Sequence, residues 1–171
     1  TYTMTINATA VNDAPTGGND AVTVSEDVET AFSTGDFTYS DVDGNAFAGI
    51  KIITVESAGD LEYNGSDVST NDVISNVANL DFTTASNGNG SPYATFDFKV
   101  YDGTAYSSST YTMTINATAV NDAPTDITGT LTIAESASSG TSAGTLTAVD
   151  PDGDACTYSE TGAGTGASIF Q

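Results

Sequence analysis

The sequence has no histidine, no tryptophan and a single cysteine, Cys156, among its 171 residues. Without histidine there is no Ser-His or Cys-His catalytic pair, and the common zinc sites are excluded as well. A lone cysteine cannot form a disulfide bond within the chain. Paired carboxylates could serve a glycosidase, but no tryptophan accompanies them here. We therefore expect that the chain is not an enzyme.

Positive charge is also nearly absent. Lys51 and Lys99 are the only basic residues against 23 acidic ones, which gives a formal net charge of −21. Nucleic-acid backbones and anionic lipids both attract basic surfaces, so neither is expected as a partner. The apolar runs are too short to span a bilayer, so we expect no direct membrane insertion. Because hydrophobic residues still make up 38% of the chain, the composition predicts a folded acidic protein whose natural partners are cations.

A repeat divides the chain. Residues 1–16 read TYTMTINATAVNDAPT, and residues 110–125 repeat this sequence at an offset of 109. Acidic residues recur at the same offset, pairing Glu26 with Glu135, Asp41 with Asp150, and Asp43 with Asp152. A fixed offset of this kind indicates one architecture used more than once. We expect the last strand of a preceding module in residues 1–13, a complete module in 14–122, and the first part of a following module in 123–171.

Alternation of apolar and polar residues predicts β-strands. It is clearest in residues 2–10, 94–100 and 111–119, where one face would be buried and the other solvated. Residues 50–55 are apolar on both faces, and the one helical candidate is a short turn within 73–80. Shorter strand candidates are residues 22–24, 37–39, 61–63 and 80–82. About seven short strands per module predict an all-β fold made of immunoglobulin/cadherin-like antiparallel β-sandwich modules in tandem.

Two short acidic loops carry the strongest chemical signal. Asp41-Val42-Asp43-Gly44 and Asp150-Pro151-Asp152-Gly153 each place two carboxylates two residues apart in a glycine turn. This spacing lets both carboxylates converge on a hard cation such as Ca²⁺, which takes six to eight oxygen ligands. A solvated Asp-Gly turn without metal is the alternative. The recurrence of the loop at the offset of 109, together with Asn-Asp pairs at residues 12–13 and 121–122, favours calcium.

These residues resemble the cadherin-like repeats of large bacterial RTX-type surface adhesins, in which Asn-Asp-Ala-Pro separates consecutive modules. The resemblance covers the complete module and the partial one, and it depends on Asn121-Asp122-Ala123-Pro124, on the Asp-x-Asp-Gly loops and on Val100-Tyr101-Asp102-Gly103. It implies calcium between consecutive modules. The implied ligands at the downstream junction are Glu26, Asn121, Asp122, Asp150 and Asp152. The implied ligands at the upstream junction are Asn12, Asp13, Asp41, Asp43 and Asp102.

The sequence departs from the cadherin pattern at some ligand positions. Ala119 and Ala123 stand where the family linker carries an acid and an asparagine, and Asp60-Leu61-Glu62 is the only candidate for the family's Asp-x-Glu motif. Fewer ligands imply one or two ions at each junction instead of three.

The expected function is that of a structural spacer in an extracellular adhesin or fibre on a bacterial cell surface. Its partners would be calcium, neighbouring modules of the same chain, and like chains in a fibre. One alternative is a module that binds glycans or ice through its threonine ladders, such as Thr110, Thr112 and Thr114. A further alternative is a filament subunit assembled by strand addition through residues 1–10.

Overall fold

The computed structural model describes residues 1–158. The chain forms two compact units, Thr1–Val120 and Asn121–Gln171. The described residues contain β-strands and two short 3₁₀ helices and no α-helix. Within that part of the chain, no helix is long and apolar enough to cross a membrane. The expectation of an all-β fold is therefore confirmed for residues 1–158.

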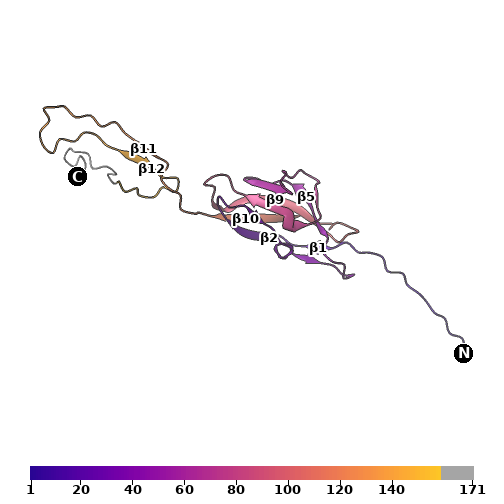
Figure 1. Ribbon diagram of the computed structural model, residues 1–171. Helices are drawn as coiled ribbons and strands as arrows, with labels where there is room; N and C mark the ends of the chain where they lie inside the picture. The colour runs from indigo at the N-terminus through magenta and orange to yellow at the C-terminus, as the bar shows by residue number, and fades with distance from the viewer. Residues whose placement is uncertain (159–171) are drawn as a thin grey trace. The chain divides into compact units, whose positions relative to one another are not determined.

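The first unit contains strands β1 to β10 and both 3₁₀ helices (Figure 1). Their bounds are β1 (Thr16–Gly17), β2 (Asp20–Ser25), β3 (Thr30–Ala31), η1 (Thr34–Asp36), β4 (Tyr39–Ser40), β5 (Gly49–Thr54), β6 (Asp60–Tyr63), β7 (Val73–Ile74), η2 (Val77–Asn79), β8 (Leu80–Thr83), β9 (Gly90–Tyr101) and β10 (Tyr111–Thr118). The strands predicted in the middle of the module are thus present, with boundaries shifted by a few residues. The predicted helical turn is split between β7 and η2.

These strands form several sheets. The largest has five strands in the order β2-β10-β9-β5-β7, a second has the order β3-β8-β6, and β1 pairs with β4. The pairs β10–β9, β9–β5, β5–β7, β8–β3, β8–β6 and β1–β4 are antiparallel. The pair β2–β10 is parallel, which the expectation of a wholly antiparallel arrangement did not include. A parallel pair needs a long connection, and most of the module lies between these two strands.

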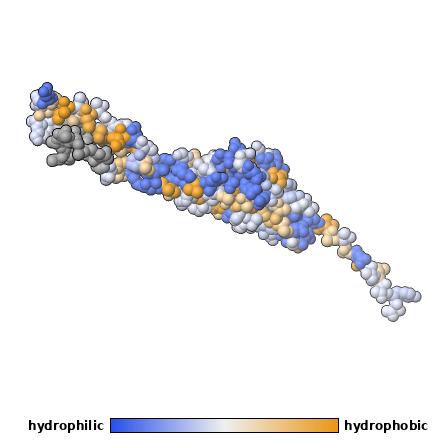
Figure 2. All heavy atoms as spheres, viewed as in Figure 1, coloured by the Kyte–Doolittle hydropathy of each residue, from blue (hydrophilic) through white to orange (hydrophobic). Residues whose placement is uncertain are grey.

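The core is formed where the alternation places apolar side chains on one face. On β9, Ala94, Phe96, Phe98 and Val100 are buried, and the residues between them are only partly buried. Side chains from the five-stranded and three-stranded sheets belong to one hydrophobic cluster. Phe32, which follows β3, contacts Phe96 edge to face with 5.8 Å between ring centroids. Hydrophilic residues cover much of the surface visible in Figure 2.

Residues 1–10 form no strand, although their sequence is that of β10. They appear in Figure 1 as a trace without arrows at the N-terminus. The prediction of a strand in residues 2–10 is therefore wrong for this structure. The physical reason is that a strand needs a neighbour for its backbone N–H and C=O groups, and the segment pairs with no strand among residues 1–158.

The second unit contains the described strands β11 (Asp126–Thr128) and β12 (Thr147–Val149), which pair antiparallel. The region predicted to start a following module, 123–171, extends past residue 158 and so lies partly outside the described residues.

Candidate metal centre

Six residues of the first unit meet through hydrogen bonds, and we call them the linker cluster. They come from the Asn-Asp pair before β1, from the Asp-x-Asp-Gly loop after β4, and from the end of β9. The linker cluster consists of Asn12, Asp13, Asp41, Asp43, Asn45 and Asp102. It contains all five residues that the resemblance assigns to the upstream junction. Their proximity is shown by the structure, and metal binding by them stays a prediction.

The Asp41 carboxylate shapes the loop around itself. Its Oδ1 atom accepts the backbone N–H groups of Asp43 at 2.9 Å and of Asn45 at 3.1 Å. Gly44 has φ +78°, a left-handed conformation that glycine adopts without strain. The Asp43 carboxylate then accepts the backbone N–H of Asp13 at 2.7 Å. The Asp-Gly turn chemistry therefore anchors the linker to the loop.

Asn12 connects the loop to the end of β9. Its Nδ2 atom donates to Asp102 Oδ2 at 2.9 Å and to the carbonyl of Asp13 at 2.9 Å. Its Oδ1 atom accepts a hydrogen bond from Asn45 Nδ2. The other Asp102 oxygen accepts the backbone N–H groups of Thr104 and Ala105, each at 2.6 Å. Three chain segments are thus held together by side chains rich in oxygen.

One buried carboxylate oxygen of the linker cluster has no hydrogen-bond partner within residues 1–158. Asp41 Oδ2 is buried and accepts no hydrogen bond from any residue in the described part of the chain. A buried carboxylate oxygen without a hydrogen-bond partner destabilises the fold, because its hydrogen bonds to water are lost and no protein donor replaces them. A hollow of about 290 Å³ lies beside the cluster and is lined by Ala10, Val11, Asn12, Asp43 and Asn45. A bound cation would satisfy the Asp41 oxygen.

The pKa values in the cluster reflect these contacts. The backbone N–H of Ala105 donates a hydrogen bond to Asp102 and lowers its pKa, and the side-chain amide of Asn12 lowers it further. Burial acts in the opposite direction. Burial raises the pKa of the Tyr39 hydroxyl, and the negative charges of Asp41 and Asp102 raise it further. Asp102 is only 7% exposed. Amide donors therefore favour an ionised carboxylate at this buried position, as a ligand for a cation requires.

The Asp-x-Asp-Gly loop of the second unit has the same hydrogen bonds as the loop of the first unit. Asp150 Oδ1 accepts the backbone N–H groups of Asp152 at 3.1 Å and of Asp154 at 3.3 Å. The backbone N–H of Asp122 donates to Asp152 Oδ2 at 2.6 Å. Asn121 Nδ2 donates to the carbonyl of Asp122 at 3.0 Å. Each of these bonds has its counterpart 109 residues earlier in the first unit, so the repeated sequence builds a repeated local structure.

Glu26, the remaining predicted ligand, lies at the other end of β2 from Asp20 and is 0% exposed. Its Oε1 atom accepts the backbone N–H of Val120 at 2.7 Å, and its Oε2 atom accepts Asn89 Nδ2 at 3.1 Å. Its own backbone N–H donates to the carbonyl of Thr118. Glu26 therefore fixes the residues that follow β10.

A second acidic group in the first unit consists of Asp60, Glu62 and Asp67, which we call the β6 cluster. One carboxylate oxygen from each residue lies within 4.8 Å of the others, so the group could hold a metal ion. Burial raises the pKa of Glu62, and the charges of Asp60 and Asp67 raise it further. The family's Asp-x-Glu candidate, Asp60-Leu61-Glu62, thus belongs to this group.

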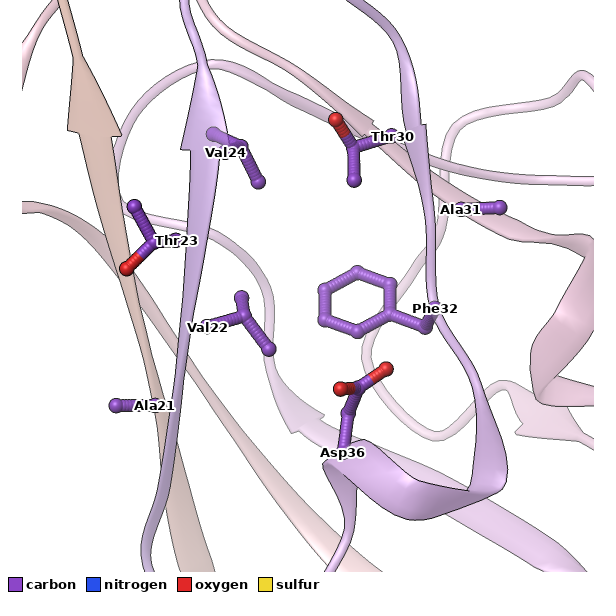
Figure 3. A pocket seen from close by; sticks show the side chains of 8 residues that line it. All are labelled: Ala21, Val22, Thr23, Val24, Thr30, Ala31, Phe32 and Asp36. Atoms are coloured by element: carbon purple, nitrogen blue, oxygen red, sulfur yellow. The ribbon is translucent and has the colours of Figure 1, made fainter.

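A pocket of about 310 Å³ lies between β2 and the β3–η1 segment (Figure 3). Val22, Val24 and Phe32 point into it, and the Asp36 carboxylate stands at one end. Asp36 Oδ2 already accepts the backbone N–H and the hydroxyl of Ser33, at 2.7 and 2.8 Å. The pocket therefore combines apolar side chains with a carboxylate that already has hydrogen-bond partners in the fold.

The proposed threonine ladder is partly engaged in the fold. Of the ladder residues, Thr112 lies on β10 and its hydroxyl donates to Asp97 at 2.7 Å. Outside the ladder, the Thr118 hydroxyl donates to the carbonyl of Val24 at 3.1 Å. These hydroxyls bind neighbouring strands of the same sheet.

Sequence reasoning missed two asparagines. Asn45 links Asp41 to Asn12, and Asn89 binds Glu26. Asn45 could have been found, because it directly follows the Asp-x-Asp-Gly loop and aligns with Asp154 at the repeat offset. Asn89 belongs to an Asn-Gly turn, and no spacing rule connects it to Glu26.

Comparisons with protein-family models, with curated proteins and with solved structures found no match for this chain.

Proposed function

We propose that this chain is a structural spacer of an extracellular bacterial adhesin or surface fibre, built of tandem cadherin-like β-sandwich modules that calcium stiffens at their junctions. The observation that carries the proposal is the buried Asp41 Oδ2 atom, which lacks a partner within the described residues and lies in a cluster of carboxylates. Ca²⁺ prefers ligands of this kind.

In the first unit, the carboxylates of Asp13, Asp41, Asp43 and Asp102 would hold the ion. Asn12 and Asn45 orient these groups through the hydrogen bonds described above. In the second unit, Asp122, Asp150 and Asp152 would act with Asn121, and Glu26 would be the ligand contributed by the complete module. The repetition of the loop bonds in both units supports the assignment.

Bound calcium supplies positive charge that compensates several carboxylates at once. Neighbouring modules of an acidic protein repel each other, most strongly where their acidic ends meet. A shared divalent ion replaces this repulsion by coordination and restricts the swing of one module about the linker. The chain's own residues supply the ligands and the short linker, so the proposed stiffness depends on ion binding.

Calcium titration calorimetry on the full chain tests the metal assignment, and small-angle scattering with calcium and with chelator tests the spacer role. We expect saturable calcium binding and a narrower distribution of dimensions when calcium is bound. Asp150→Asn serves as the matched variant for Asp41→Asn, because the two residues hold equivalent loops. Each variant should lose a different part of the heat of binding. Absence of calcium binding by the parent chain would exclude the proposal.

A further inference from the structure

The same ten residues occur in two environments in this chain. Thr1–Ala10 and Thr110–Ala119 have identical sequences. In β10, Met113 and Ile115 are 0% exposed, whereas the equivalent Met4 and Ile6 are 85% and 84% exposed. The chain therefore carries two copies of one strand sequence, one in the core and one with its core-forming side chains in solvent.

β10 lies between β2 and β9 in the five-stranded sheet, and we call this position the β10 slot. β2 pairs with β10 in parallel from Asp20 opposite Met113 to Ser25 opposite Thr118. On the other side β9 pairs antiparallel, with Ala94 opposite Ile115. Because the sequences are identical, Thr1–Ala10 can make every contact in this slot that β10 makes.

The residue that follows the donated strand could also replace its equivalent in the acceptor. Glu26 Oε1 accepts the backbone N–H of Val120. A strand made by Thr1–Ala10 would place the N–H of Val11 at the same position. The fully buried carboxylate would then keep its hydrogen bond.

The chain cannot fill its own slot with this segment. The linker cluster lies at the Tyr111 end of β10, because Asn12 binds Asp102 just beyond β9 and Tyr111 is paired with Phe98 of β9. Residue 9 would have to replace Thr118 at the opposite end, about 23 Å away at the rise of a β-strand. The three residues from 9 to 12 reach only about 10 Å. The donor must therefore be another molecule.

We propose that the β10 slot is an exchange site for a second copy of this chain, in which Thr1–Ala10 of one copy replaces a detached β10 of another. The exchange buries Met4 and Ile6 and releases their equivalents, so it leaves the buried area of the acceptor unchanged. It is independent of the calcium proposal. Intact copies remain single until β10 opens, because association costs free energy that identical contacts do not return.

A pair of aspartate substitutions tests the exchange. Ile115→Asp in the full chain places a carboxylate at a fully buried position of β10, so β10 can no longer hold the slot, while Ile6 still can. We expect this variant to form folded assemblies of two or more copies by light scattering, with a melting temperature that falls on dilution. The double variant Ile6→Asp/Ile115→Asp should neither assemble nor unfold cooperatively. Ile6→Asp alone should melt like the parent.

A cysteine trap defines the register. Since Ile115 faces Ala94 in β9, a donated strand would place Ile6 opposite Ala94 of the acceptor. Opposed residues of antiparallel strands have Cα atoms about 4.5–5.5 Å apart, within the range of about 4.4–6.8 Å that a disulfide bridges. Ile6→Cys and Ala94→Cys, added to Ile115→Asp and Cys156→Ser, should give disulfide-linked dimers on oxidation.

The milder variant Ile115→Ala covers the case in which Ile115→Asp does not refold. A synthetic peptide of residues 1–16 should raise the melting temperature of Ile115→Ala, and the same peptide with Ile6→Asp should not. The proposal is overturned if the two peptides act alike. It is also overturned if Ile115→Asp stays monomeric, or if the double variant assembles to the same extent.

Discussion

The first unit carries two acidic groups that differ in what surrounds their carboxylates. In the linker cluster, backbone and amide N–H groups point at the oxygens, and the pKa of Asp102 is lowered. In the β6 cluster, burial and neighbouring carboxylates act together, and the pKa of Glu62 is raised. Crowding of acids thus disfavours their charge, whereas amide donors stabilise it. The comparison shows that hydrogen-bond donors, and not the number of acidic residues alone, decide whether a carboxylate in these clusters keeps its charge.

The largest expected effect separates the two clusters by their response to calcium. Calcium at about 100 times its dissociation constant would stabilise the fold by about 2.7 kcal/mol, or roughly 10 °C in melting temperature for a domain of this size. The Asp41→Asn variant should lose most of this calcium-dependent rise in the melting temperature of the first unit. The Asp67→Asn variant should show the same rise as the parent chain. Melting curves with calcium and with chelator provide the measurement. Equal losses in both variants would remove the distinction between the clusters.

A smaller effect concerns the pH dependence of Asp102, measured in chelator. Its pKa in the folded protein is below the ordinary value of 3.8, so its carboxylate contributes stability above that pH and loses it as the pH falls through the folded pKa. Asp102→Asn should therefore lower the melting temperature at neutral pH. The difference from the parent should shrink in acid. A melting-temperature difference between Asp102→Asn and the parent that is the same at pH 7 and pH 3 would contradict this account.

The smallest expected effect has the opposite sign. The pKa of Glu62 in the folded protein is above its ordinary value of 4.5. The contribution of Glu62 to stability is complete below that value and is lost as the pH rises through the folded pKa. Glu62→Gln should therefore raise the melting temperature slightly at pH 7 and have no such effect near pH 4.

Salt provides the control for the Glu62 variant. Screening weakens repulsion between exposed charges, so added sodium chloride should reduce the gain from Glu62→Gln. A Glu62→Gln variant less stable than the parent at neutral pH would show that repulsion does not dominate in the β6 cluster.

The sequence predicted much of this from periodicity and repetition. The alternation in residues 94–100 correctly placed four buried side chains on β9. The recurrence at 109 identified Asn12, Asp13, Asp41 and Asp43 of the linker cluster, whereas Asp102 was expected from the resemblance and Asn45 was missed. Both succeed because they depend on local spacing or on two copies of one pattern.

Other features depend on contacts between distant segments. The parallel pairing of β2 with β10 joins residues 20–25 to residues 113–118, and no local pattern gives its direction. The same applies to the bond between Asn89 and Glu26, which are 63 residues apart. The failed strand in residues 2–10 makes the same point, since an identical sequence forms a strand only where neighbouring strands receive it.

The parallel pair has a mechanical consequence. β2 lies near the start of the module and β10 at its end, and the two strands point the same way. Tension that pulls the linker before β1 away from the residues after β10 would slide these strands past each other. Six paired positions would then bear the load together, in shear, instead of opening one after another like a zipper.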